Sequence, residues 1–240
     1  MNLDKKEKIE DLQCDNLKII QNSSLYTFTS DSVILANYIK TKRGDIVVEI
    51  GGGCGVISIL VQAKHPQARI FIFEIQEKMQ ELCKKNIKLN KLQDKIYLIP
   101  DDVKKFEQYL LVGSIDVVYA NPPYFKVTKF DQKDVKKNAK EEVFLNANDL
   151  VLTASKMLRF GGAFYCCYPA ERSTEIVCLC QKYNMAIKEM FYTENGKGQV
   201  KLFIFKAVKG GKSGVKVFPN LVTNDKNGDY LEKLHTKNFL

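Results

Sequence analysis

Short apolar runs alternate with longer amphipathic stretches along most of this chain. Compact runs rich in β-branched and aromatic side chains predict buried strands at residues 46–50, 70–74, 96–99 and 115–119. Residues 55–63 and 79–87, which lie between these runs, carry apolar side chains at helical spacing. Strands that alternate with helices in this way are typical of an α/β fold with a parallel sheet.

The pattern continues near the C-terminal half of the chain. It predicts a helix from residue 148 that ends at Gly161 and Gly162, and then an apolar strand over residues 163–168. A further helix and two strands are predicted at residues 171–183, 185–192 and 201–208. The turn around residues 196–198 joins the last two strands into a hairpin.

Residues 25–32 lead into an apolar helix over residues 33–40. Ser30 or Asp31 is well placed to accept the free backbone N–H groups at the start of that helix, which predicts a capping role for both. The functional alternative is that residues 26–29 form a flap over a bound ligand. The pattern by itself favours the cap.

The length of 240 residues suits one large α/β domain with small appendages, and such a chain can bury a sizeable core. We predict an N-terminal cap segment at residues 1–43, the main domain at residues 44–208 and a basic C-terminal tail at residues 209–240. The tail is rich in glycine and lysine. Two alternatives stay open for it: disorder, or a course along the surface that extends a basic face.

The seven cysteines show no paired spacing of the kind that metal sites and disulfide frameworks use. Only two histidines accompany them, so we expect no metal site and small buried thiols in a reducing compartment. Residues 1–12 are charged and lack the apolar core of a signal peptide, and no run approaches the length of a membrane helix. We therefore expect a cytoplasmic protein without membrane contact, either a monomer or a weak homodimer.

The formal net charge is +9, and the lysines cluster. A polyanionic partner is one interpretation, although lysine-rich surfaces also keep proteins soluble. Residues 125–140 contain six lysines, Lys126 and Lys129 among them, interleaved with Phe125 and Phe130. Lysines neutralise phosphates and aromatic rings stack on bases, so this segment favours nucleic acid over the alternative of a solvated loop that closes over any substrate.

The first predicted strand runs into a glycine turn. Glu49 precedes the turn, and Gly51, Gly53 and Gly55 alternate along it, where glycine permits positive φ angles and close approach of a ligand. A dinucleotide fingerprint that starts at Gly51 requires glycine or alanine where Val56 stands, and no Walker loop is present. We interpret the turn as a nucleotide cradle of another type, while a plain strand-to-helix connection stays possible on the turn alone.

Carboxylates also follow the next two predicted strands. Glu74 ends the second strand, where an acidic side chain can accept both hydroxyl protons of a ribose. This requirement is shared by several nucleotide cofactors, NAD among them, and the alternative role of Glu74 is to cap the next helix. Asp102 follows the third strand, where its simplest role is that of a turn residue.

Two short segments resemble motifs of a known enzyme class. The acidic-x-Gly-x-Gly-x-Gly pattern of residues 49–55 resembles motif I of the class I S-adenosylmethionine-dependent methyltransferases. The ANPPY segment, residues 120–124, looks like motif IV of those methyltransferases that act on planar amino nitrogens. Ligands collect at the carboxyl ends of parallel strands, so we expect both turns to face one cleft.

The chemistry that the second motif implies has a physical basis. An exocyclic amine on a purine is a poor nucleophile, because its lone pair is delocalised into the ring. The side-chain oxygen of Asn121 and the carbonyl of Pro122 can accept the two amine protons, which favours a pyramidal nitrogen with an available lone pair. Tyr124 can stack on the target base. No histidine base is required, since the amine loses its proton after attack, and alignment of the reacting atoms supplies much of the acceleration.

The resemblance extends over nearly the whole chain. Several segments, in matching order, resemble the bacterial tRNA adenine-N6 methyltransferases that act beside the anticodon of valine tRNA. These segments include YTFTSDSVILA, KNIKLN, NPPYF and VFPNLVTNDKNGDY. The resemblance implies a Rossmann-like, seven-stranded, mostly parallel sheet with an antiparallel last strand and helices on both faces. It also implies S-adenosylmethionine as cofactor, tRNA as partner, and contact of Asp102 with the adenine of the cofactor.

The chain departs from that family in a few places. Glu49 and Gly52 replace the commoner Asp and Thr of motif I, and the usual Ala-Arg-x-Glu segment appears as residues 139–142, Ala-Lys-Glu-Glu. Lysine does not reproduce the bidentate contacts of arginine, so the RNA contacts are affected more than the chemistry. Three alternatives stay open: a glutamine N5-methyltransferase acting on protein, an rRNA guanine-N2 methyltransferase, and a catalytically silent RNA-binding module.

Overall fold

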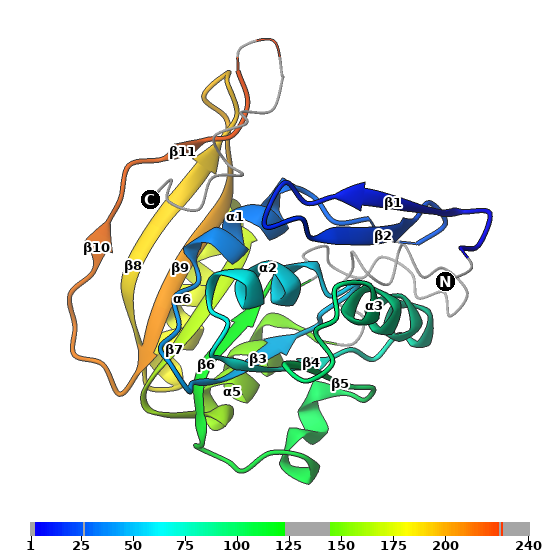
Figure 1. The fold of residues 1–240 in the computed structure, drawn as a ribbon. Coiled ribbons are helices and arrows are strands. Elements are labelled where there is room, and N and C mark those ends of the chain that lie inside the picture. The colour runs from blue at the N-terminus through cyan, green and yellow to red at the C-terminus, as the bar shows by residue number, and fades with distance from the viewer. Residues whose placement is uncertain (1–2, 26, 123–144, 226, 228–240) are drawn as a thin grey trace.

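The computed structural model describes residues 3–25, 27–122, 145–225 and residue 227. Its centre is a nine-stranded sheet in the order β10-β8-β9-β7-β6-β3-β4-β5, with β11 paired to β8 (Figure 1). The parallel strands are β3 (Ile46–Ile50), β4 (Arg69–Phe73), β5 (Ile96–Ile99), β6 (Ile115–Ala120) and β7 (Leu158–Pro169). The hairpin of β8 (Met185–Glu194) and β9 (Val200–Lys209) extends this sheet, because β9 pairs antiparallel with β7.

This arrangement confirms the predicted fold class. The seven predicted strands correspond to β3 through β9, and β9 is the antiparallel strand inserted beside β7. The short strands β10 (Lys216–Val217) and β11 (Leu221–Val222) both pair parallel to β8 and cover the edge of the sheet. An edge strand left open presents unpaired backbone groups to other chains, so this cover protects β8.

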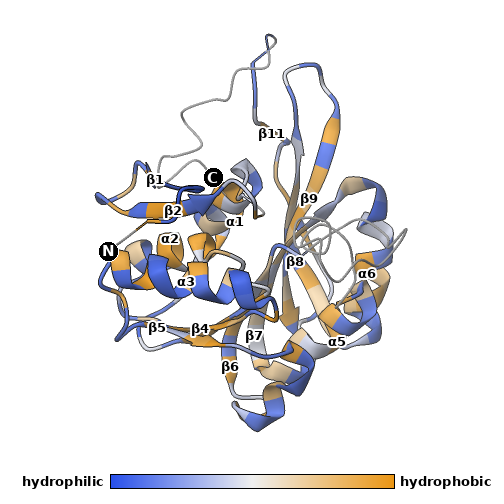
Figure 2. Cartoon of the chain, turned by 90° about the vertical axis from the view of Figure 1, so that its right-hand side faces the viewer, coloured by the Kyte–Doolittle hydropathy of each residue, from blue (hydrophilic) through white to orange (hydrophobic). Residues whose placement is uncertain are grey.

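Helices cover both faces of the sheet (Figure 2). One face packs against α1 (Ser30–Tyr38), α2 (Val56–Lys64) and α3 (Glu77–Leu89). The other face packs against the 3₁₀-helix η1 (Val103–Gln108), α5 (Ala147–Met157) and α6 (Ser173–Lys182), which the short helix η2 (Ala170–Arg172) precedes. Two hydrophobic cores result, one on each side of the sheet, and their burial is the main stabilising contribution.

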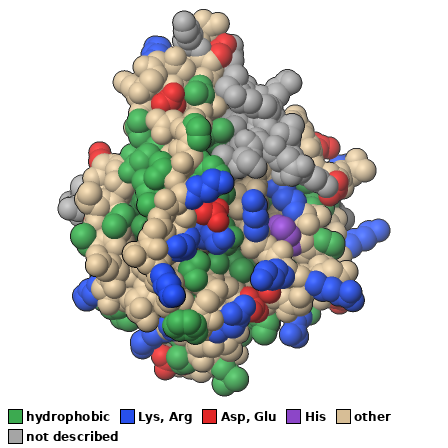
Figure 3. Space-filling model, turned by 90° about the vertical axis from the view of Figure 1, so that its left-hand side faces the viewer, with side chains coloured by type: hydrophobic (Ala, Val, Ile, Leu, Met, Phe, Trp, Pro, Cys, Tyr) green, Lys and Arg blue, Asp and Glu red, His purple; other side chains and the backbone are tan. Residues whose placement is uncertain are grey.

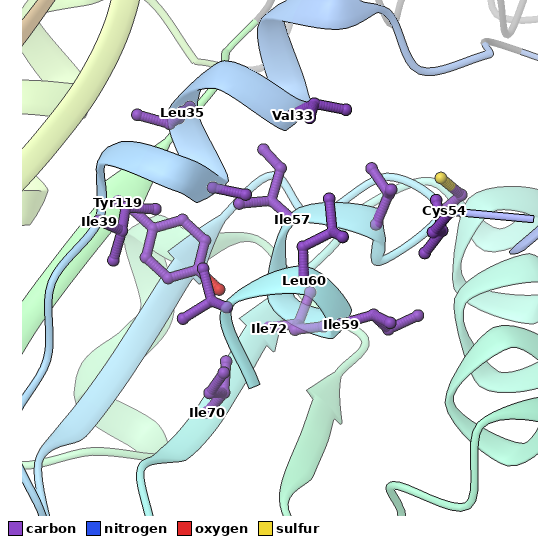
Figure 4. Packing of buried hydrophobic residues seen from close by; sticks show 14 of the residues in the cluster. Val33, Leu35, Ile39, Cys54, Ile57, Ile59, Leu60, Ile70, Ile72 and Tyr119 are labelled. Carbon is purple, nitrogen blue, oxygen red and sulfur yellow. The ribbon is translucent and has the colours of Figure 1, made fainter. Parts of the chain in front are cut away.

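The core under α1 and α2 positions the candidate site. Figure 4 shows Val33 and Leu35 of α1 above Ile57 and Leu60 of α2, with the ring of Tyr119 from β6 beside them. These side chains are at least 93% buried, and each contributes about 1.5 to 3 kcal/mol on leaving water. The helices that carry the pocket walls are therefore rigidly held against the sheet.

Gly161 and Gly162 do not end the preceding helix, and that prediction was wrong. The helix α5 ends at Met157, and both glycines lie near the start of β7. A Cβ atom at Gly162 would lie 3.0 Å from the backbone oxygens of Arg159 and Ile115, and the register between β6 and β7 shifts here. Gly162 is required by a close backbone approach at this irregularity in the sheet, and Gly161 by its φ angle of +77°.

The predicted caps of α1 are also corrected. The capping position belongs to Thr29, whose side chain makes no capping hydrogen bond, and Ser30 and Asp31 lie inside the first turn. The Thr29 hydroxyl donates instead to the Asp31 carboxylate at 3.1 Å. Asp31 is half-buried, and desolvation raises its pKa.

Pattern analysis did not predict the N-terminal hairpin of β1 (Glu7–Asp11) and β2 (Lys18–Asn22). Two asparagines one turn apart on α3 hold it in place. The Asn86 amide accepts from Ile20 N at 2.6 Å and donates to Ile20 O at 3.1 Å. Asn90 repeats this pairing with the backbone of Lys18, at 2.9 and 2.7 Å. The side chains of α3 thus take the place of a neighbouring strand.

Over its described residues the C-terminal tail lies along the surface of the protein, which was the second of the two alternatives for it. Residues 209–225 run along β8, where Thr223 N donates to Glu194 O at 2.9 Å and Leu221 is buried. The division of the chain at residues 43 and 208 stays a prediction. None of the described helices is long and apolar enough to cross a membrane.

Candidate active site

A pocket opens at the carboxyl ends of β3, β4, β5 and β6, where ligands of parallel sheets bind. Of the predicted site residues, its lining includes Glu49, Gly51, Gly53, Glu74, Asp102, Asn121 and Pro122. Gly55 is absent from the lining, and Tyr124, Phe125, Lys126 and Lys129 lie outside the described residues. Side chains that sequence reasoning did not assign also line it: Phe28, Ser32, Ile75, Met79 and Val103.

The glycine turn has two different steric requirements. Gly51 and Gly53 have φ angles of +71° and +55°, in the region that favours glycine. Gly52 has no such angle, but a Cβ atom there would lie only 2.1 Å from Cγ2 of Ile72 on β4. Ile72 therefore leaves no room for a side chain at position 52, which explains why glycine stands there in place of the commoner threonine of motif I.

Gly55 does not line the pocket and has a packing role between two helices. It is the residue before α2 with φ +84°, and an added Cβ would lie 2.9 Å from the Cys83 thiol of α3. Its role in the described structure is thus to let α2 start close to α3. A direct contact of Gly55 with a cofactor stays a prediction.

Glu74 is held at the rim by backbone donors. Its Oε2 accepts from Gly53 N and its Oε1 accepts from Gln76 N, both at 2.8 Å. The capping residue of α3 is Gln76, so Glu74 is not the cap of that helix. Burial raises the pKa of Glu74, while the two N–H donors oppose that rise by stabilising the carboxylate. The glycine turn holds one oxygen and the residue before α3 holds the other, and each oxygen keeps capacity for a further donor.

Glu49 lies deeper and is held by hydroxyl groups. Its carboxylate accepts from the Ser58 hydroxyl, and the Ser58 and Tyr119 oxygens are 2.6 Å apart. All three side chains are almost fully buried between β3, α2 and β6. Desolvation raises the pKa of Glu49 to about 8, although the hydrogen bonds from Ser58 oppose this. Burial between these elements therefore favours the protonated form of Glu49.

Sequence reasoning missed this buried network. Ser58 interrupts an otherwise apolar helix, and a single hydroxyl among buried apolar positions was the available signal. Tyr119 reads as one more apolar residue of a strand, so its contact with the network becomes visible only when β6 lies beside β3.

Two neighbouring aspartates follow β5 and both line the pocket. Asp102 accepts from Lys104 N at 2.9 Å and so caps η1, as the turn interpretation predicted. Asp101 is bound by Lys105 at 2.9 Å and by the Tyr109 hydroxyl at 2.8 Å, and these donors lower its pKa to about 2. Contact of Asp102 with a cofactor stays a prediction.

Asn121 stands at the carboxyl end of β6, beside the first turn of α1. Its side-chain nitrogen donates to the Ser32 hydroxyl at 3.3 Å, which ties the amide to the first turn of α1. Pro122 is buried next to it. Phe28 and Ser32 both line the pocket, which supports the flap alternative for the segment that precedes α1.

The parallel sheet with one inserted antiparallel strand, the glycine turn after β3 and the carboxylate after β4 form the nucleotide site that a class I S-adenosylmethionine-dependent methyltransferase requires. The family model of the methyltransferase small domain matches residues 24–175, and the chain belongs to this family. The predicted class of enzyme and its cofactor, S-adenosylmethionine, are thereby confirmed.

Individual relatives carry more specific names. A tRNA1(Val) (adenine(37)-N6)-methyltransferase of Dyadobacter fermentans is 24% identical over 148 residues, which make up 60% of this chain and 59% of the relative. A protein of the same name from Phocaeicola vulgatus is 24% identical over 169 residues, 70% of each chain. The crystal structure of a predicted O-methyltransferase from Agrobacterium tumefaciens has a TM-score of 0.69 at 18% identity, over 86% of this chain and 96% of that one. That likeness shows the fold alone.

Proposed function

We propose that this chain transfers a methyl group from S-adenosylmethionine to the exocyclic amine of an adenine in tRNA, next to the anticodon. One observation carries the proposal: the Asn121 amide, tied to Ser32, lies in the same pocket as the glycine turn and Glu74. The names of the relatives from Dyadobacter and Phocaeicola support adenine in tRNA as the target.

The residues of the pocket fit the cofactor. Glu74, held by two backbone N–H groups, has the carboxylate that a ribose diol requires, and the turn at Gly51 and Gly53 brings the backbone close to a ligand. To Asp102, which lines the same pocket, we assign the hydrogen bond from the adenine amino group of the cofactor. When bound, the cofactor supplies the electrophilic methyl group.

The described residues near Asn121 account for activation of the amine. The Asn121 side-chain oxygen and the Pro122 carbonyl accept the two amine protons, so the nitrogen lone pair points away from them. This lone pair would form the new C–N bond as the bond between the methyl group and the sulfur of the cofactor breaks, with its electron pair left on sulfur, and the nitrogen would then release one proton to water. Proline keeps the acceptor in place because its ring locks φ. No buried base is needed.

The proposal is tested with Asn121→Ala. We expect turnover on tRNA to fall by about 10²-fold or more, the usual loss when one precisely placed polar group of a transition state is removed. Calorimetry should show unchanged affinity for S-adenosylmethionine, because the cradle is intact. Gln181→Ala, an exposed amide on α6, is the matched control.

The reaction product separates the alternatives. Purified protein is incubated with labelled cofactor and either total tRNA or release factors, followed by nucleoside mass spectrometry. N6-methyladenosine supports the proposal, N2-methylguanosine or labelled protein supports one of the two rival enzymes, and full turnover by Asn121→Ala contradicts the mechanism. A protein that fails to bind the cofactor would support the silent RNA-binding module.

A further inference from the structure

Basic side chains gather on the side of the molecule where β8 and β10 form the edge of the sheet (Figure 3). Backbone and side-chain contacts connect these residues across elements that are far apart in the sequence. We call this surface the basic face and define it by six lysines: Lys40, Lys42, Lys64, Lys188, Lys206 and Lys216.

The helix α1 and β7 bring the first lysines of this surface together. The Tyr165 hydroxyl donates to Lys40 O at 3.4 Å, and the Lys206 ammonium lies 5.8 Å from the centre of the same tyrosine ring. At the end of α1, Lys64 donates to Ala36 O at 3.4 Å. Basic residues from the segment after α1, from α2 and from β9 therefore converge around the C-terminal end of α1.

The C-terminal tail adds to the same surface. Lys188 donates to Lys212 O at 3.2 Å and to Gly214 O at 2.8 Å, which holds the tail against β8. Strand β10 then places the exposed Lys216 opposite Glu189. The basic tail is thus an ordered extension of this surface over its described residues.

In the part of the chain that the structure describes, the lysines of the basic face outnumber the two carboxylates bound to them, Glu189 and Asp45. Glu189 is bound by Lys206 at 2.9 Å and by the Tyr38 hydroxyl at 3.4 Å, so its charge is already neutralised. Asp45 accepts from Lys42 N at 2.7 Å. Gathering an excess of like charges is unfavourable in the free protein, and a polyanion relieves that repulsion.

The helix α1 connects the basic face to the pocket. Ser32, in its first turn, touches Asn121, while Tyr38, at its end, touches Glu189 of the basic face. Six residues of helix span about 9 Å, which is roughly three nucleotides along one strand. A base in the pocket and phosphates on the basic face can therefore belong to one RNA molecule.

We propose that the basic face binds the phosphate backbone of the RNA whose adenine enters the pocket. The inference rests on the proposed function and deepens it by assigning the surface that holds the RNA. Exposed lysines neutralise phosphates without reading sequence, so the face supplies affinity and orientation.

The test neutralises three exposed lysines of the basic face in one variant, Lys40→Gln, Lys42→Gln and Lys216→Gln. Lys188 and Lys206 are left intact because they have structural partners. A control variant carries Lys84→Gln, Lys88→Gln and Lys95→Gln, exposed lysines on α3 and before β5, the opposite edge of the sheet, so both variants lose the same charge.

Binding of tRNA is measured by filter retention at several salt concentrations, with the Kd of S-adenosylmethionine and the melting temperature as checks on the fold. For the variant of the basic face, we expect the slope of log K against log salt to fall in magnitude by about 2 to 3, roughly one per phosphate contact, and KM for tRNA to rise at least tenfold. Affinity for the cofactor should not change. The control should resemble the wild type.

Two outcomes overturn the inference while the wild type still methylates tRNA: an unchanged slope in the variant of the basic face, or equal losses in both variants. Retained tRNA binding would mean that the face serves a different partner or none. A wild-type protein that neither binds nor methylates tRNA refutes the proposed function itself, and the two failures are thereby distinguished.

Discussion

Two carboxylates at the ends of adjacent strands, Glu49 on β3 and Glu74 after β4, differ in how the fold holds them. Backbone N–H groups hold both oxygens of Glu74, whereas Glu49 is bonded to the Ser58 hydroxyl in a buried network with Tyr119. Backbone donors cannot turn away or accept a proton, so they preorganise a charged acceptor. Hydroxyls adapt to either protonation state of their partner. The surroundings of Glu74 thus favour a fixed hydrogen bond to a charged carboxylate. The surroundings of Glu49 allow its carboxyl group to change its protonation state.

The largest expected effect on cofactor binding comes from Glu74→Ala. Loss of hydrogen bonds from the ribose to a charged acceptor weakens binding by about 10- to 100-fold, the range for hydrogen bonds to charged groups. Calorimetry with S-adenosylmethionine measures this change. Glu81→Ala, an exposed glutamate on α3, is the control, and an unchanged Kd for Glu74→Ala would remove Glu74 from the site.

The substitution Glu49→Gln tests whether the charge of Glu49 changes when the cofactor binds, through the pH dependence of cofactor affinity. In the free protein the pKa of Glu49 is raised to about 8, and a cofactor of net positive charge favours the ionised form. The wild type should therefore bind S-adenosylmethionine more tightly as pH rises from 7 to 9, by about tenfold, since one pKa unit of coupling is about 1.4 kcal/mol. The glutamine variant should lose this dependence. The same slope in both proteins would exclude Glu49.

The same substitution changes folding stability with a defined sign. The folded pKa of Glu49 lies above its unfolded value of 4.5, so the folded state binds the extra proton between those pH values. This contribution to stability is complete below pH 4.5 and is lost as pH rises through about 8. Urea unfolding without cofactor at pH 6 and pH 8.5 should show a smaller loss of unfolding free energy in Glu49→Gln than in the wild type.

The smallest effect is expected for Ser58→Ala. Removal of one hydrogen bond in the network should lower the unfolding free energy by about 1 kcal/mol. The bond from Ser58 lowers the pKa of Glu49, so its loss should move the midpoint of the pH-dependent cofactor binding to higher pH. Ser213→Ala in the exposed tail is the control. A midpoint that does not move would assign Ser58 a packing role only.

The strands that carry the site were predictable from local pattern. Strands β3 and β5 have the predicted bounds, residues 46–50 and 96–99, because strands covered by helices read as continuous apolar runs. The predicted positions of Glu49, Glu74 and Asn121 followed from the carboxyl ends of β3, β4 and β6. The N-terminal hairpin was not predictable in this way, because side chains of α3, more than sixty residues away, hold it in place.

The sequence by itself determined the order of strands and helices, the class of enzyme and the turns that carry the reacting groups, because these depend on residues close together in the chain. Only the tertiary structure decided that Gly52 is confined by Ile72, that Ser58 and Tyr119 reach Glu49, and that lysines from distant elements form one surface. Those features depend on which strands become neighbours. Burial and approach between such neighbours are properties of the packed chain, and no local pattern encodes them.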